Sequence, residues 1–240
     1  MVHVIVLAGG SGSRMHTEVP KQLIKIAGKE LIWYSMHVFE EDPEIDNIIL
    51  VTRKEDIPYF RSELVDKYGF TKVHRICPGG EERYHSVYNG LSAIDPEEAD
   101  ENIVMVHDGA RPFVTHRMIH DSVQTIRDGY TACTVGMPVK DTIKIVTKTG
   151  NSVMGTDTPD RNTLYQIQTP QTFLYSLLKR SYEKCMEDKA KNITDDTMLV
   201  EQYGGVLSKI LPGSYENIKL TTPDDLEIAE IFANKILKKM

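Results

Sequence analysis

The sequence predicts an α/β protein in which a mostly parallel β-sheet has helices on both faces and a β-hairpin arm projects from it. Three observations lead to this fold class. Short apolar runs alternate with amphipathic segments between residues 2 and 135, as in strands joined by helical crossovers. The runs are apolar throughout, as expected for strands that are covered on both faces. The alternation then ends after Pro138.

Five apolar, β-branched runs predict the strands of the sheet. They are residues 2–7, 47–52, 73–77, 102–107 and 131–135. Apolar residues at helical spacing predict the crossover helices, at about 31–39, 56–68, 84–94 and 116–128. A last helix follows Thr222-Pro223-Asp224-Asp225, which supplies an N-cap, a proline at the first helical position and acids in the first turn. Its predicted buried stripe consists of Ile228, Ile231, Phe232 and Ile236.

The arm is predicted at about residues 139–160, where two strand-like runs flank the turn pair Gly150-Asn151. A projecting arm on a compact domain indicates a dimerisation device, and from the pattern alone a simple surface insertion fits equally well. We find no internal repeat, low-complexity segment or linker, so residues 1–240 are predicted to form a single domain.

Composition excludes several classes of protein. The net charge of −7 disfavours binding to nucleic acid, which usually needs a basic field over the domain. No apolar run approaches the roughly 20 residues that span a bilayer, and the opening residues lack the features of a signal peptide, so we expect a cytoplasmic protein without membrane contact. The three scattered cysteines have no zinc-binding spacing and are expected to be free thiols.

The first candidate site is the glycine-rich turn after the first strand, LAGGSGSRM at residues 7–15. Backbone N–H groups in such a turn can bind phosphate. A dinucleotide fingerprint would need glycine or alanine where Met15 stands, and a P-loop would end in Gly-Lys-Ser/Thr, so both familiar motifs fail. A loop that places Arg14 and Lys21 beside phosphates remains, against the alternative of a glycine turn with two solvated cations.

The second candidate site is VHDGARPF at residues 106–113, which follows a buried strand. A carboxylate at the carboxyl end of such a strand lies where open α/β sheets bind ligands, and Asp108 could hold Mg²⁺ against phosphate oxygens. Arg111 could bind a second phosphate in a forked geometry. The alternative for Asp108 is a turn cap, and His107 is expected to be a packed supporting residue.

Motifs along essentially the whole chain resemble one family. LAGGSGSRM with PKQ, GGEERYHSVYNGL, VMVHDGARPF, PVKDTIK, DRNTLYQIQTPQTF, TDD and NIKLTTPDDL occur in the order found in the 2-C-methyl-D-erythritol 4-phosphate cytidylyltransferases. The resemblance implies a Rossmann-like nucleotidyltransferase fold that dimerises through its arm. It also implies the transfer of CMP from CTP to methylerythritol phosphate, with release of pyrophosphate, in the non-mevalonate route to isoprenoid precursors.

The resemblance assigns roles to individual residues. The catalytic cations would be Arg14, Lys21 and Lys219. Ala8, Gly9, Gly10, Ser11 and Gly12 would wrap CTP, while Gly80, Glu81 and Ser86 would meet the cytosine and ribose, largely through backbone groups. Arg83, in the same motif, has the alternative of an ion pair at the start of a helix.

The acceptor site follows in the same way. Asp108 would associate with Mg²⁺, or another divalent cation, and the residues around the sugar phosphate would be Asp108, Arg111, Asp141, Thr142, Arg161, Thr169, Thr194 and Lys219. Arg161 and Thr169 would reach the neighbouring subunit's site. The alternatives are a hairpin turn for Asp141-Thr142, a helix N-cap for Thr194 and a solvated strand position for Lys219.

Other functions compete with this one. Ribitol 5-phosphate cytidylyltransferase of teichoic acid synthesis has a similar glycine loop and PKQ segment. A catalytically silent nucleotide-binding protein should have lost one of Arg14, Lys21, Asp108 or Lys219, and all four are present. A NAD-dependent dehydrogenase is disfavoured by Met15.

Overall fold

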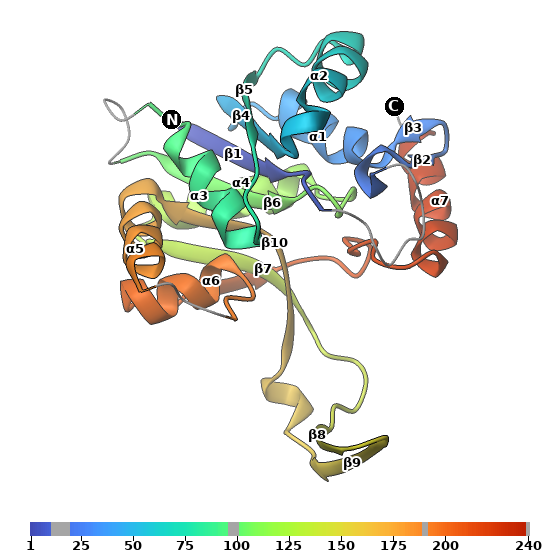
Figure 1. Ribbon diagram of the computed structural model, residues 1–240, viewed down its shortest axis with the longest axis vertical. Coiled ribbons are helices and arrows are strands. Elements are labelled where there is room, and N and C mark those ends of the chain that lie inside the picture. Colours follow the sequence, from blue (N-terminus) through green and yellow to red (C-terminus); the bar gives the residue numbers. More distant parts are fainter. Residues whose placement is uncertain (11–19, 96–100, 189–191, 239–240) are drawn as a thin grey trace.

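The structure is a computed structural model, which describes residues 1–10, 20–95, 101–188 and 192–238. Its centre is a seven-stranded sheet in the order β11-β7-β10-β6-β1-β4-β5 (Figure 1). The strands are β1 (Val2–Leu7), β4 (Asn47–Thr52), β5 (Val73–Pro78), β6 (Ile103–Asp108), β7 (Ala132–Pro138), β10 (Tyr165–Leu174) and β11 (Lys209–Pro212). Neighbouring strands pair in parallel except at β10, which is antiparallel to both β6 and β7. The predicted α/β class and all five predicted strands are therefore confirmed.

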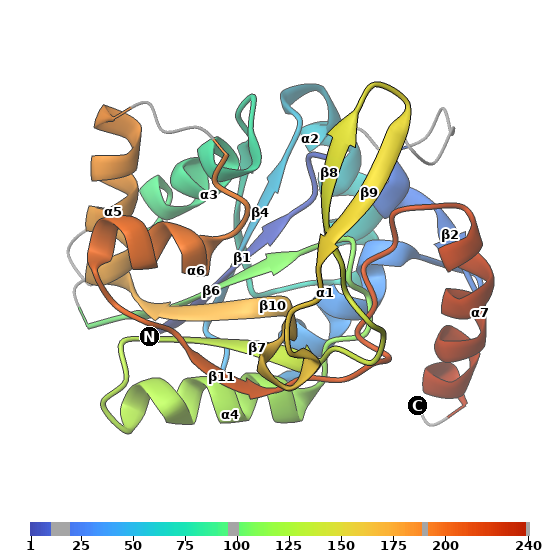
Figure 2. The ribbon, with the colours of Figure 1, turned by 90° about the horizontal axis from the view of Figure 1, so that it is seen from below.

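Helices cover both faces of the sheet, as predicted. They are α1 (Leu31–Glu41), α2 (Ile57–Tyr59) continuing into η4 (Phe60–Asp66), α3 (Arg83–Ser92), α4 (His116–Arg127), α5 (Tyr175–Glu187), α6 (Asp196–Leu199) continuing into η7 (Val200–Gly204), and α7 (Asp224–Leu237). Figure 2 shows α5 and α6 on one face and α4 on the other. Short elements complete the chain: η2 (Lys21–Leu23), β2 (Lys25–Ile26), β3 (Lys29–Glu30), η3 (Lys54–Asp56) and η6 (Arg161–Thr163).

Alternation along the strands divides the core into two clusters. Val4 and Val6 of β1 pack with α1, α4 and α7, whereas Ile5 packs on the opposite face with α3, α5 and α6. β4 and β6 follow the same alternation, so each strand has apolar side chains on both faces. This two-sided burial is why the strands are apolar throughout in the sequence.

The predicted buried stripe of the last helix is wrong in its register. In α7, Ile228 and Ile231 are 46% and 59% exposed, while Ala229 and Ala233 are buried. The face toward the core passes through the two alanines because their small side chains let the helix approach closely, and the predicted Phe232 and Ile236 pack only partly against the core. The helix begins at Asp224 with the predicted acids in its first turn, but Pro223 is the N-cap and no side chain caps the helix, so the predicted capping arrangement is wrong. Asp225 instead accepts hydrogen bonds from the N–H groups of Thr221 and Thr222.

The arm has the predicted hairpin geometry. β8 (Ile145–Thr149) pairs antiparallel with β9 (Ser152–Asp157), and Gly150 in the turn has a φ of 58°, a conformation that favours glycine. The hairpin projects away from the sheet (Figure 1), and its residues are exposed.

Two further expectations can be compared with the structure. All three cysteines are free thiols, as predicted. Within the described ranges, no helix combines the length and apolarity needed to cross a bilayer.

Candidate active site

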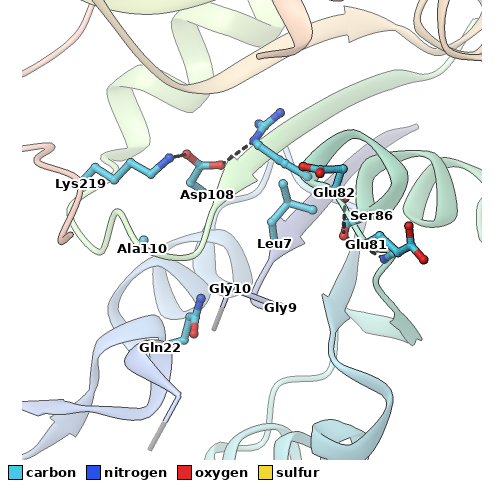
Figure 3. A pocket seen from close by; sticks show the side chains of 12 residues that line it. Leu7, Gly9, Gly10, Gln22, Glu81, Glu82, Ser86, Asp108, Ala110 and Lys219 are labelled. Carbon is cyan, nitrogen blue, oxygen red and sulfur yellow. Dashed lines mark hydrogen bonds and ion pairs between the residues drawn. The ribbon is translucent and has the colours of Figure 1, made fainter. Parts of the chain in front are cut away.

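A cavity of about 400 Å³ lies at the carboxyl ends of the parallel strands β1, β5 and β6 (Figure 3). Its volume falls within the range of sites that bind small molecules, and open α/β sheets bind ligands at this edge. The lining residues are Leu7, Gly9, Gly10, Gln22, Gly80, Glu81, Glu82, Arg83, Ser86, Asp108, Ala110 and Lys219.

Strand register brings the two candidate sequence motifs together. Leu7, the last residue of β1, is paired with Asp108, the last residue of β6. The next residue, Gly109, donates its N–H to the carbonyl of Leu7 at 2.9 Å. A Cβ on Gly109 would lie 2.8 Å from that carbonyl oxygen, so glycine is needed for this close approach. The glycine turn therefore begins directly beside Asp108.

The glycine turn contributes two of its residues to the described part of the cavity, Gly9 and Gly10. Ala8 is buried, and its N–H donates to the carbonyl of Val51 at 2.7 Å. Ala8 therefore supports the turn through the fold. The predicted contacts of Ser11, Gly12 and Arg14 lie outside the described residues, and so does the side chain of Lys21, whose backbone begins η2.

The predicted base and ribose residues lie on the opposite wall, where β5 leads into α3. The N–H of Gly80 donates to Ser86 Oγ at 3.1 Å, which closes a tight turn over the helix start. A Cβ on Gly80 would lie 2.3 Å from the Cβ of His85, so only glycine fits there. Glu82 and His85 form a capping box that fixes the first turn of α3. This packing places Gly80, Glu81 and Ser86 on the cavity wall.

Asp108 is the acidic centre of the cavity and is held by two cations. Lys219 Nζ lies 2.7 Å from Oδ2, and Arg83 Nε lies 3.2 Å from Oδ1. Burial alone would raise the pKa of Asp108, but the charges of Arg83 and Lys219 hold that pKa well below its usual range. Asp108 is therefore a carboxylate at neutral pH, and its side chain bonds to these two cations in place of the turn cap that was its alternative. Lys219 is exposed, as its solvated alternative requires, but its ammonium group is paired with Asp108 at the cavity.

Arg83 extends from this pair to a second carboxylate. Its Nη1 and Nη2 lie 3.1 and 2.7 Å from the two oxygens of Asp196, which is fully buried and also accepts a hydrogen bond from the hydroxyl of Tyr182. Burial would lower the pKa of Arg83, but Asp196 and Asp108 raise it well above its ordinary value. Arg83 is the first residue of α3, yet its ion pairs cross to β6 and α6 and are not local to the helix start.

A hydrogen-bond chain behind Asp108 fixes its backbone. The N–H of Asp108 donates to Thr169 Oγ1 at 3.1 Å, and that oxygen lies 3.1 Å from Nδ1 of His107. The Nε2 of His107 lies 2.9 Å from the carbonyl oxygen of Arg111, which can only accept, so Nε2 carries the proton and Nδ1 accepts from Thr169. Burial lowers the pKa of His107 to about 4, which keeps the ring neutral. His107 is thus a packed supporting residue, as expected.

This chain also locates two of the predicted acceptor residues. Thr169 is buried against its own subunit's Asp108, so the prediction that it reaches a neighbouring subunit's site is wrong. Arg111 does not line the cavity. Its guanidinium donates to the carbonyls of Asn217 at 2.9 Å and Ile167 at 3.5 Å, and thereby holds the segment that leads to Lys219.

The remaining predicted residues lie away from the cavity. Asp141, Thr142 and Arg161 are exposed on the arm, where Arg161 Nη1 donates to the carbonyl of Lys140 at 2.9 Å. The hairpin turns at Gly150-Asn151, so a turn role for Asp141-Thr142 does not apply. Thr194 is exposed, and the N-cap of α6 is Asp195, which accepts from the N–H of Met198 at 2.8 Å.

Two residues of the cavity region, Asp196 and Gln22, were missed as functional candidates, whereas Arg83 was named with an ion pair at the start of a helix as its alternative. Arg83 and Asp196 belong to the sequence motifs GGEER and TDD, but their pairing spans 113 positions and no local pattern indicates it. Gln22 of PKQ lines the cavity and is buried, and its Oε1 has no hydrogen-bond partner within the described part of the chain. Its position directly after Lys21 is the only signal that the sequence offers.

A glycine turn, a carboxylate and a lysine meet at the carboxyl edge of a mostly parallel sheet, an arrangement that suits a nucleotide and its phosphates, and the family match places the chain among the nucleotidyltransferases. The family model described as IspD, 2-C-methyl-D-erythritol 4-phosphate cytidylyltransferase, matches residues 2–235. The chain therefore belongs to the 2-C-methyl-D-erythritol 4-phosphate cytidylyltransferase family.

Individual relatives agree with this assignment. The 2-C-methyl-D-erythritol 4-phosphate cytidylyltransferase of Lachnospira eligens is 45% identical over 95% of this chain and 97% of its own length. The enzyme of the same name from Clostridioides difficile is 44% identical over 98% of this chain and 94% of its own length. The crystal structure of 4-diphosphocytidyl-2C-methyl-D-erythritol synthase from Anaerococcus prevotii superposes with a TM-score of 0.82 at 31% identity, covering 97% of this chain and 96% of that one.

Proposed function

We propose that this chain transfers CMP from CTP to 2-C-methyl-D-erythritol 4-phosphate, giving CDP-methylerythritol and pyrophosphate in the non-mevalonate route to isoprenoid precursors. The observation that supports it most directly is the cavity itself. One wall carries Gly80, Glu81 and Ser86, which suit a nucleoside, and the other carries Asp108 and Lys219, which suit a reacting phosphate. The relatives named above carry the methylerythritol name, and no observation favours ribitol 5-phosphate.

The chemistry requires positioning more than proton transfer. The phosphate of the acceptor attacks the α-phosphorus of CTP in line, and pyrophosphate leaves. A phosphate monoester is already a competent nucleophile at neutral pH, so no general base and no covalent enzyme intermediate are needed. Lys219 brings the attacking phosphate into line, while Arg14 and Lys21 neutralise charge on the triphosphate. The described cavity supplies no neutral histidine or free thiol that would suit another mechanism.

A divalent cation, Mg²⁺ in the first instance, fits this site through Asp108. Mg²⁺ is commonly held by one or two carboxylates together with substrate phosphates, and Asp108 is one ionised carboxylate facing the cavity. The described residues offer no cluster of three or more acidic, histidine or cysteine side chains, so substrate phosphates would complete the coordination. When bound, the cation would offset negative charge on the triphosphate.

The active form is proposed to be a homodimer of single-domain subunits, joined by the arm at about 139–160. Ile143, Ile145, Val153 and Met154 on the arm are 39%, 53%, 59% and 65% exposed. An isolated two-stranded hairpin is marginally stable in water, so these apolar side chains need a partner surface. In such a dimer the arm carries Arg161 toward the partner's acceptor site, which accounts for its distance from the cavity of its own chain.

One incubation tests the activity. Purified protein, CTP and Mg²⁺ are mixed with either 2-C-methyl-D-erythritol 4-phosphate or ribitol 5-phosphate, and pyrophosphate release is measured. We expect turnover with the methylerythritol substrate and a CDP-methylerythritol product by mass spectrometry. Faster turnover of ribitol 5-phosphate would replace the proposal with the teichoic acid enzyme, and no turnover of either would support a silent nucleotide-binding protein.

A further inference from the structure

Four charged side chains form an unbroken row that begins in the cavity and ends in the protein interior. In order they are Lys219, Asp108, Arg83 and Asp196, with contacts of 2.7, 3.2 and 2.7 Å between neighbours. Figure 3 shows Lys219 reaching Asp108 from one side, and a second dashed line leaves Asp108 on the other. The two cations of this row differ in how firmly they are held.

The side chain of Lys219 is free to move away from Asp108. The contact with Asp108 is the sole side-chain partner of its ammonium group among the described residues, and its side chain is 39% exposed. Water and ligand therefore reach the ammonium group. Its backbone is fixed by the neighbouring Leu220, whose N–H donates to the carbonyl of Ala110 at 2.9 Å, so movement is confined to the flexible side chain.

The guanidinium of Arg83 is held firmly beside Asp108. Two of its nitrogens are bound to the carboxylate of Asp196, in the forked geometry that orients a guanidinium. Asp196 is itself fixed, because its N–H donates to Gln171 Oε1 at 2.9 Å and its carboxylate accepts from Tyr182. The third nitrogen, Nε, is thereby aimed at Asp108.

We propose that Arg83 is a positioning residue for the transfer reaction. Anchored by Asp196, its guanidinium keeps the carboxylate of Asp108 compensated and in place when Lys219 moves to an incoming phosphate. Without Arg83, Asp108 would have no other cation and would retain Lys219, since an uncompensated buried charge is strongly unfavourable. This inference rests on the proposed function and adds to it the residue that makes Lys219 exchangeable.

A double-mutant cycle in steady-state kinetics tests the coupling. Arg83→Gln is expected to lower kcat roughly 10–100-fold, as when the outer partner of a functional ligand is removed, and to raise the KM for the sugar phosphate more than that for CTP. In an Asp108→Asn background the same substitution should lower kcat by about threefold or less, because the carboxylate that Arg83 holds in place is absent. An equal decrease in kcat in both backgrounds would mean that Arg83 acts only on the fold, and would overturn the proposal.

Two further variants separate this role from folding. Arg83→Gln leaves Asp196 buried without its cation, so Arg83→Gln/Asp196→Asn removes both charges and should fold while remaining slow. Wild-type kcat in that double variant would overturn the proposal. The matched control is Arg75→Gln, which breaks the exposed ion pair of Arg75 with Asp95 at 3.0 Å and should leave kcat unchanged.

A binding measurement reports on the inference independently of turnover. Calorimetric titration with inorganic phosphate, which stands in for the phosphate group of the acceptor, is carried out without metal. It should show binding to the wild type, at least about tenfold weaker binding to Arg83→Gln, and tighter binding to Asp108→Asn, in which Lys219 is already free. No binding to the wild type, or equal affinity in Arg83→Gln, would overturn the inference. If neither sugar phosphate turns over, the proposed function fails while this titration still decides the role of Arg83.

Discussion

At the scale of single residues, Lys219 shows how position gives a common side chain a specific role. Its ammonium group lies in a cavity beside a carboxylate, on a segment whose backbone is fixed at Asn217 by Arg111 and at Leu220 by Ala110. Nothing in the residue itself distinguishes it from the other lysines of the chain. The difference is that its charge is placed where the proposed reaction gathers negative charge.

Replacing this lysine is the most direct test at the residue scale. Lys219→Ala should lower kcat/KM by about 10²–10³, the usual cost of removing a preorganised group that stabilises a transition state. The fold should be intact, because Asp108 keeps its contact with Arg83. Steady-state kinetics and circular dichroism measure the two effects. Near-normal turnover would limit Lys219 to compensating the charge of Asp108.

A second prediction concerns Gly80. In Gly80→Ala, the added methyl would overlap the Cβ of His85, so the turn that carries Glu81 and Ser86 must shift. We expect the KM for CTP to rise about tenfold or more while the KM for the sugar phosphate changes little, because the two predicted subsites lie on different walls. Kinetics with each substrate varied in turn measures this. The control is Gly129→Ala, at a loop position with open space around it but a φ of 99°, which should affect stability and not KM.

At the scale of secondary structure elements, the sequence predicted five strands whose stability comes from apolar burial. It missed two strands of the main sheet, the short edge strand β11 and β10, which depends on polar contacts. Gln168, Thr169, Gln171 and Thr172 of β10 are all buried. Their partners are distant in sequence: Gln171 bonds to Asp195 and Asp196, and Gln168 to Ser214. A polar strand of this kind cannot be separated from a loop until those partners are known, and the same holds for the pairing of Arg83 with Asp196.

The candidate site was predictable to the extent that its residues follow a strand directly. The glycine turn after β1, the Gly80 turn after β5 and Asp108 at the end of β6 all lie at the edge where the parallel strands place them. The register of α7 was not predictable. Ala229 and Ala233 are less hydrophobic than the isoleucines beside them, so the sequence pattern favours the isoleucines as the buried face, yet the small alanine side chains permit the closest packing.

A prediction about pH belongs to β3, which leads into α1. Glu30 is buried and accepts hydrogen bonds from Lys67 Nζ at 2.9 Å and Tyr68 Oη at 2.7 Å. Burial would raise the pKa of Glu30, but these hydrogen bonds lower it below its ordinary value of 4.5. A lowered pKa means that the ionised form stabilises the fold above about pH 4.5, and that this contribution is lost as the pH falls through the folded-state pKa.

Glu30→Gln should therefore reduce the free energy of unfolding by about 1–3 kcal/mol at pH 7. The difference from the wild type should shrink progressively as the pH falls below about 4.5, because the unfolded chain then takes up a proton before the folded carboxylate does. Thermal unfolding across this pH range measures it, with the exposed Glu63→Gln as the control. A difference that stays constant from pH 7 to pH 3 would show that shape, and not charge, accounts for the effect.

At the scale of the whole molecule, the predicted site residues fall into two main groups. Among the described residues, one group lines the cavity or supports it, and another, Asp141, Thr142 and Arg161, lies exposed on an arm that projects from the sheet (Figure 1). Thr194 belongs to neither group. If both groups serve one reaction, the arm must act on a second copy of the chain. The exposed apolar side chains of the hairpin provide the surface through which two copies could associate.

Mixing two inactive variants tests this arrangement. Arg161→Ala and Lys21→Ala subunits should each be nearly inactive alone, because each homodimer lacks a required cation in both sites. In a heterodimer with shared sites, one site carries both defects and the other carries neither. Activity should therefore return to about a quarter of the wild-type value in an equal mixture, since half of the dimers are mixed and each has one intact site.

Recovery is measured as pyrophosphate release after subunit exchange is verified by native mass spectrometry. If exchange is complete and activity stays absent, Arg161 serves its own subunit's site or none, and the arm has a role in association alone.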